Sequence, residues 1–68
     1  MMTHAEKRDR GLTICQMLAD GKTRKQIAAD MSRTRATVDQ SIASMVQKHN
    51  VATETGLISK LMREGIIV

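Results

Sequence analysis

Positive charge gathers directly after Gly21, where Lys22, Arg24 and Lys25 stand within four residues together with Thr23. Ammonium and guanidinium groups bind phosphate oxygens through charge-assisted hydrogen bonds, and a threonine hydroxyl supplies a further donor. Residue types in this pattern indicate a segment that anchors a polyanion. The alternative for each cation is a solvated surface charge, which is less favoured for a cluster than for a single residue.

After Arg35 the sequence has no further cation until Lys48. Arg33 and Arg35 follow the cluster, but within residues 36–47 the only charged side chain is Asp39. An acid that faces DNA should lower affinity, because bases and phosphates carry dense negative charge, unless its carboxylate accepts a hydrogen bond from cytosine N4. This segment therefore combines a phosphate anchor with a largely neutral stretch.

Other chemistry is not predicted. Cys15 is the only cysteine and lies among apolar residues, so we expect a buried small hydrophobe. His4 and His49 are far apart and have no partners at ligand spacing, which predicts no metal site and no cofactor. The sequence shows no paired carboxylates, no nucleophile beside a base and no glycine-rich phosphate loop, so we do not expect an enzyme.

Composition narrows the class of protein further. The chain has 68 residues, enough for one domain (1–68), and 11 Lys+Arg against 7 Asp+Glu give a net charge of +4. This surplus permits binding to nucleic acid or an acidic partner, although it is also simply solubilising. Phe, Tyr and Trp are absent, which disfavours single-strand binding by base stacking. Neither a signal peptide nor a membrane span is predicted, so we expect a cytoplasmic protein.

The elements that must position these residues are four helices. A threonine precedes each of them at a capping position: Thr3 three residues before Glu6, Thr23 three residues before Gln26, then Thr34, then Thr53 or Thr55. Glycines 21 and 65 are placed to end the first and last helices. The predicted helices span about residues 4–20, 24–31, 35–49 and 54–64. No strand-like alternation occurs, so the sequence predicts an all-α fold.

Apolar periodicity assigns faces to the last two helices. In the third, an apolar stripe that begins at Val38 and Ile42 should face the core. The opposite side should carry Ala36, Gln40, Ala43, Ser44 and Gln47. In the fourth, one stripe of Leu57 and Leu61 lies about 100° from a second stripe of Ile58 and Met62. One stripe can pack on the core and leave the other for a partner, or a small bundle can cover all four side chains.

The second and third helices are joined by about three residues, which in a basic chain favours a helix-turn-helix. Over residues 19–67 the sequence resembles the C-terminal DNA-binding domain of LuxR-type regulators, the GerE-like helix-turn-helix, without a gap. The matching motifs are "A-D-G" at 19–21, "K-Q-I-A" at 25–28, "T-R-A-T-V" at 34–38, "K-H-N-V" at 48–51 and the final "G-I-I" at 65–67. The family's usual "L-T-x-R-E" start is missing, and the positions of Asp39 and Ala43 are often lysine in members that read DNA.

The resemblance implies a four-helix domain that binds double-stranded DNA as a homodimer, with the third helix as recognition helix and the fourth as dimer contact. The phosphate contacts would be Lys22, Thr23, Arg24, Lys25, Arg33 and Thr37. The base contacts would be Arg35, Asp39, Gln40 and Ala43, with Arg35 on guanine and Gln40 on adenine. The dimer or partner contacts would be Leu57, Ile58, Leu61 and Met62.

A second hypothesis uses the same fold differently. If the fourth helix pairs with that of a LuxR-type regulator, the chain could be an anti-activator, such as one encoded by a phage or mobile element, or another protein-interaction module. A recognition helix with little positive charge is expected in that case, because contact with DNA is no longer needed.

Overall fold

The structure, a computed structural model, describes residues 4–68, with side chains from residue 10 onward. Over this range the chain forms helices and no strand: α1 (His4–Ala19), α2 (Arg24–Asp30), α3 (Arg35–Lys48) and α4 (Glu54–Arg63). The predicted all-α fold is confirmed. The helices α2, α3 and α4 begin at the residues expected from the sequence, and all four helices end one residue earlier than expected. Thr3, the predicted cap of the first helix, lies outside the described residues.

Threonine caps define where the last three helices begin. The hydroxyl of Thr23 accepts from the backbone N–H of Gln26, and the Gln26 side chain accepts from the Thr23 N–H, which completes a capping box. Thr34 caps α3 by accepting from the Thr37 N–H, and Thr53 rather than Thr55 caps α4. Each cap satisfies a backbone donor that the helix itself leaves open.

All four helices end in a left-handed residue. Gly21 and Gly65 take this conformation after α1 and α4, with φ of 90° and 71°. Ser32 and Asn50 take it after α2 and α3, with φ of 53° and 54°. The next residue in each case donates its N–H back into the last turn, as Arg33 does to Ala28 O at 2.8 Å. These are Schellman-type ends, and they turn the chain sharply enough for the helices to pack.

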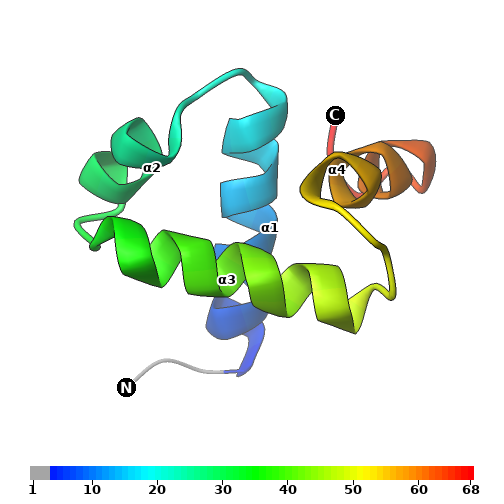
Figure 1. The fold of residues 1–68 in the computed structure, drawn as a ribbon, viewed down its shortest axis with the longest axis horizontal. Helices are drawn as coiled ribbons and strands as arrows, with labels where there is room; N and C mark the ends of the chain where they lie inside the picture. Colours follow the sequence, from blue (N-terminus) through cyan, green and yellow to red (C-terminus); the bar gives the residue numbers. More distant parts are fainter. Residues whose placement is uncertain (1–3) are drawn as a thin grey trace.

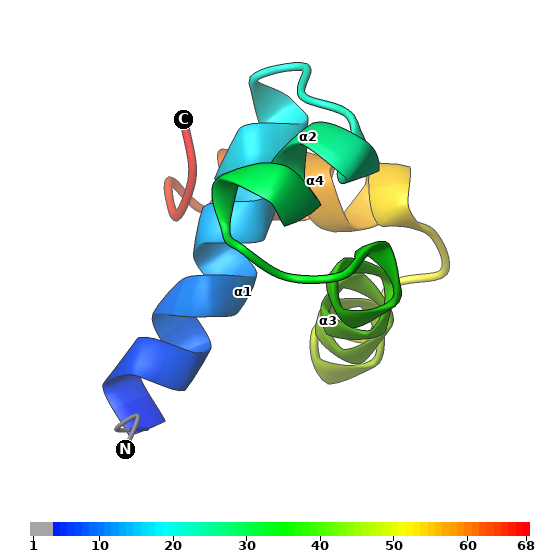
Figure 2. The same cartoon turned by 90° about the vertical axis from the view of Figure 1, so that its left-hand side faces the viewer.

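The helices form a bundle around α1 and α3. In Figure 1, α3 runs across α1, while α2 and α4 lie on opposite sides of α1. Both α1 and α3 pack against the other three helices, whereas α2 and α4 do not pack against each other. Figure 2 shows α3 nearly end-on at one edge of the molecule, so that its outer side faces solvent.

The core has two halves, which meet at neighbouring residues of α1. Ile14 joins the cluster beneath α2, together with Ile27, Ala28, Val38 and Ile42. Cys15 joins the cluster beneath α4, together with Met45, Leu57, Leu61 and Ile67. Gly11 allows the close approach of α1 to α3, since a Cβ there would lie 2.8 Å from Met45 Sδ.

The end of the chain is fastened to α1. Ile67 is buried in the core, and the Gln16 side chain pairs with the backbone of Val68, accepting from its N–H at 2.9 Å and donating to its carbonyl oxygen. Local sequence patterns do not predict this contact, because its two residues are 52 positions apart.

Candidate nucleic-acid interface

The helix pair α2–α3 presents α3 at the surface. The connection is the segment 31–34, in which Ser32 takes the left-handed conformation. Ile27 and Ala28 of α2 are buried against Val38 and Ile42 of α3, so apolar packing holds the two helices at a set angle. The predicted core stripe of α3 is confirmed, with Val38, Ile42 and Met45 buried.

The outer face of α3 is exposed and uncharged. Its residues are those expected on the side opposite the core: Ala36, Gln40, Ala43, Ser44 and Gln47. Two glutamine amides therefore project from a face of otherwise small side chains. Such a face allows close approach to another surface, and each amide offers both a donor and an acceptor.

Exposed cations lie at the start of α3 and on α2. Lys25, Arg33 and Arg35 are exposed, and none of them forms an ion pair with a described residue. Lys22 is different, because its Nζ lies 2.7 Å from Asp30 Oδ2, with both side chains a little under half exposed. An exposed ion pair of this kind contributes little stability, so the Lys22 ammonium can leave Asp30 and bind another anion.

The two threonines predicted to contact phosphate are already bonded within the chain. Thr23 uses its hydroxyl oxygen as the α2 cap, and the Thr37 hydroxyl lies 3.0 Å from that of Thr34. A hydroxyl that accepts can still donate its own proton. The structure therefore leaves Thr23 able to donate to a phosphate as well as to cap.

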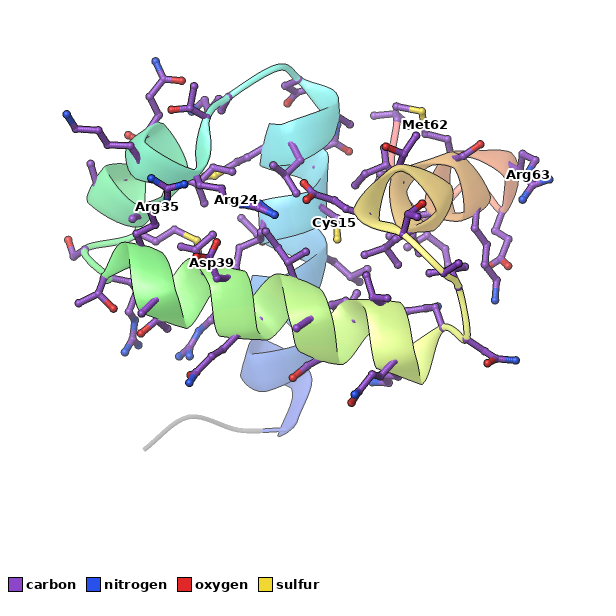
Figure 3. The ribbon with its side chains drawn as sticks, in the orientation of Figure 1. Cys15, Arg24, Arg35, Asp39, Met62 and Arg63 are labelled. Carbon is purple, nitrogen blue, oxygen red and sulfur yellow. The ribbon has the colours of Figure 1, made fainter. Side chains whose placement is uncertain are left out.

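Arg24 does not present the free guanidinium that the phosphate prediction requires. Its Nε lies 3.1 Å from Asp39 Oδ1 of α3, and its Nη2 donates to Glu54 Oε2 of α4. The Arg24 side chain is 28% exposed and reaches from the start of α2 toward the space between α3 and α4 (Figure 3). Arg24 thus links its own helix, α2, to α4, and these two helices do not otherwise pack together.

The Asp39 carboxylate is correspondingly paired with the Arg24 guanidinium. In Figure 3 it projects from the side of α3 that faces Arg24, and its side chain is 49% exposed. It lies at the edge of the outer face, one turn before Ala43 and about 40° from it around the helix. The opposite charges at positions 24, 39 and 54 are visible in the sequence, but their spacing along the chain carries no signal that they meet.

The fourth helix separates its two apolar stripes. Leu57 and Leu61 are fully buried in the chain's own core, so neither is available to a partner in this structure. Ile58 is half-buried and Met62 is 44% exposed. Both line a shallow groove whose other lining residues are Leu18, Glu54, Thr55 and Ser59. The predicted partner contact is therefore narrowed to Ile58 and Met62.

Reactive or metal-binding chemistry has no support among the described residues. Burial raises the pKa of the Cys15 thiol, and the nearby negative charge of Glu54 raises it further, so the reactive thiolate is disfavoured. No three His, Cys, Asp or Glu side chains gather in residues 10–68 where they could hold a metal ion. Within the described part of the chain, no helix has the length and apolar character needed to cross a bilayer.

Comparison with known proteins agrees with this arrangement. The family model of bacterial regulatory proteins of the luxR family, GerE, matches residues 9–61, which include the helix-turn-helix and most of α4. Comparisons with curated proteins and with solved structures return no match. Because the family model covers most of the chain and the described helices have the arrangement of its helix-turn-helix, this protein belongs to the LuxR family of bacterial regulatory proteins, whose shared domain binds DNA.

Proposed function

We propose that this protein is a small transcriptional regulator that binds double-stranded DNA in the cytoplasm as a homodimer, with α3 in the major groove. The observation that carries the proposal is the exposed outer face of α3, together with exposed cations at the start of that helix (Arg33 and Arg35) and on α2 (Lys25). A recognition helix needs an accessible face toward the bases and cations that reach the flanking phosphates.

The phosphate contacts are assigned to exposed side chains around the start of α2 and α3. Lys25 and Arg33 are the principal candidates, because both are exposed and neither is engaged by a described acid. Lys22, Thr23 and Thr37 join them by exchanging or sharing their present bonds. Arg24 is omitted from this set, since two carboxylates already hold its guanidinium.

The base contacts are assigned to α3. Gln40 lies in the middle of the outer face, and its amide can pair with the N6 and N7 atoms of adenine. Arg35 projects from the first turn and can donate two hydrogen bonds to guanine. Ala43 leaves room for a base edge to approach α3 one turn after Asp39.

The homodimer contact is assigned to Ile58 and Met62 on α4. The groove beside them includes Leu18, so the exposed apolar surface extends from α4 onto α1. A two-fold arrangement through this surface would place two copies of α3 on successive turns of a DNA duplex.

Selection of randomised duplex DNA on the purified protein at about 100 mM salt tests the proposal. We expect a palindromic motif whose affinity falls steeply with salt, because cations released from phosphates contribute to binding. Gln40→Ala should weaken binding by about 1–3 kcal/mol and relax the preference at an adenine. Gln47→Ala makes the same change two turns farther along the same face and should have the smaller effect.

One observation favours a second function. The outer face of α3 carries no cation in residues 36–47, while α4 exposes Met62 beside an apolar groove. An anti-activator that pairs through α4 with a LuxR-type regulator would need the groove and not the outer face of α3. Selection that returns no motif and only weak, salt-sensitive binding would support this function over the first.

A further inference from the structure

The Arg24 guanidinium lies between one carboxylate of α3 and one of α4. It meets Asp39 Oδ1 through Nε, at 3.1 Å, and Glu54 Oε2 through Nη2. None of the three side chains is more than half exposed: 28% of Arg24, 49% of Asp39 and 33% of Glu54 are accessible. A planar guanidinium held by two acids from different helices has little freedom to turn toward a phosphate.

This contact changes what Asp39 can do at the surface of α3. The positive charge of Arg24 compensates the negative charge of Asp39. This compensation lowers the repulsion between the Asp39 carboxylate and nearby DNA phosphates. Among the described residues Arg24 is its only ion-pair partner, and the contact engages Oδ1. Oδ2 therefore remains as an acceptor on a half-exposed side chain at the edge of the outer face.

We infer that Asp39 is a specificity-determining residue that accepts a hydrogen bond from cytosine N4, and that Arg24 is the positioning residue that makes this possible. The inference rests on the proposed binding of duplex DNA. A carboxylate is an acceptor only, and the N4 amino group is the donor that cytosine presents in the major groove. Guanine presents two acceptors there and thymine presents O4, so the same carboxylate disfavours both bases.

The test replaces single cytosines in the site selected from randomised DNA. Each C·G pair is changed in turn to U·A, which puts an acceptor where cytosine has its amino group and adds no methyl group. For the unaltered chain, one position per half-site should lose roughly tenfold or more in affinity through Asp39. Asp39→Asn should reduce the discrimination at that position to less than about threefold.

Arg24 is tested by a double-mutant cycle, because a structural residue and a positioning residue behave differently in it. Arg24→Gln should lower both overall affinity and the cytosine discrimination, since Asp39 is then uncompensated. Arg24→Gln combined with Asp39→Asn should recover affinity but not discrimination. Glu54→Gln is the matched control, because it removes the other acid and leaves the Arg24–Asp39 pair in place. Thermal unfolding of each variant separates loss of fold from loss of recognition.

The outcomes are distinguishable. If Asp39→Asn keeps the same cytosine discrimination at every position, or tightens binding uniformly, the carboxylate only repels DNA and the inference is overturned. If the double variant binds no better than Arg24→Gln, Arg24 has a structural function alone and its positioning role is overturned. If the unaltered chain selects no motif, the proposed function fails and the inference fails with it.

Discussion

At the scale of single residues, the part that a charged side chain plays depends on what it touches in the folded chain. Arg24 belongs by sequence to a basic cluster, but it is held by Asp39 and Glu54, while its neighbour Lys25 stays free for an external anion. The acid at the edge of the outer face of α3 is therefore accompanied by its own counter-charge. The contact is only partly buried, and we place its importance in the position that it gives to Asp39.

Cys15 illustrates the same dependence for a titratable group. The thiol is fully buried between α1, α3 and α4, and burial raises its pKa above the ordinary value. In the unfolded chain the thiol ionises at about pH 8.5, whereas in the folded chain it stays protonated to higher pH. The free energy of unfolding should therefore be unaffected by this group at neutral pH and should fall as the pH rises above about 8.5.

Urea unfolding between pH 7 and pH 10 measures this loss, with Cys15→Ala as the comparison. The variant should be less stable at pH 7 by about 1–2 kcal/mol, because it leaves a small cavity. Its stability should then decline less steeply with pH than that of the unaltered chain, because the thiol that ionises on unfolding is missing. Parallel pH profiles for the two proteins would contradict the assignment. Alkylation of the thiol should be slow in the folded state and rapid in urea.

At the scale of elements, local hydrogen bonds set where each helix begins and ends. Threonine caps begin α2, α3 and α4, and left-handed residues end all four helices. Two of those ends use glycine, whereas Ser32 and Asn50 adopt the same conformation with a side chain. A non-glycine residue in this region carries a conformational cost of about 1–2 kcal/mol, which asparagine bears more easily than serine.

Ser32→Gly should therefore stabilise the protein. The expected gain is about 0.5–1 kcal/mol, or roughly 3–6 °C in Tm for a chain of this size. Ser44→Gly makes the same substitution on the exposed face in the middle of α3 and should lose a similar amount, because glycine is unfavourable inside a helix. Thermal denaturation followed by circular dichroism reports both changes. A loss of stability on Ser32→Gly would mean that its side chain is needed in the turn.

At the scale of the whole molecule, α4 has an inner and an outer apolar stripe. Leu57 and Leu61 complete the core half that contains Cys15, and Ile58 and Met62 are left beside the groove. The fold and the proposed association therefore depend on different residues of one helix. Substitutions in α4 can therefore change stability and association separately.

Leu57→Ala should cost about 2–5 kcal/mol of stability, because it empties a fully buried site. Ile58→Glu should leave the monomer folded and abolish self-association, since it places a charge in the proposed contact. Sedimentation equilibrium, with Tm measured alongside, distinguishes these effects. Ala29→Glu, an exposed position on α2, adds the same charge away from the groove and should leave association unchanged. An Ile58→Glu protein that still dimerises would place the contact elsewhere.

The sequence by itself determined the helices, their boundaries and the faces of α3. These features rest on interactions within a few residues, such as the Thr23–Gln26 capping box and the apolar repeat from Val38 to Met45. The same local patterns carried the resemblance to the family that the comparison then established. Short-range hydrogen bonds and periodic burial depend on residues that are close in sequence, so they can be inferred without knowledge of the tertiary structure.

Only the tertiary structure decided which charges and apolar stripes are available to a partner. Arg24, Asp39 and Glu54 lie on three different helices, and they meet because the packing of α1 and α3 brings α2 and α4 within reach of one side chain. The burial of Leu57 rather than Ile58 likewise follows from the direction in which α4 docks on the core. Such contacts depend on the relative placement of whole helices, and local sequence spacing carries no information about that placement.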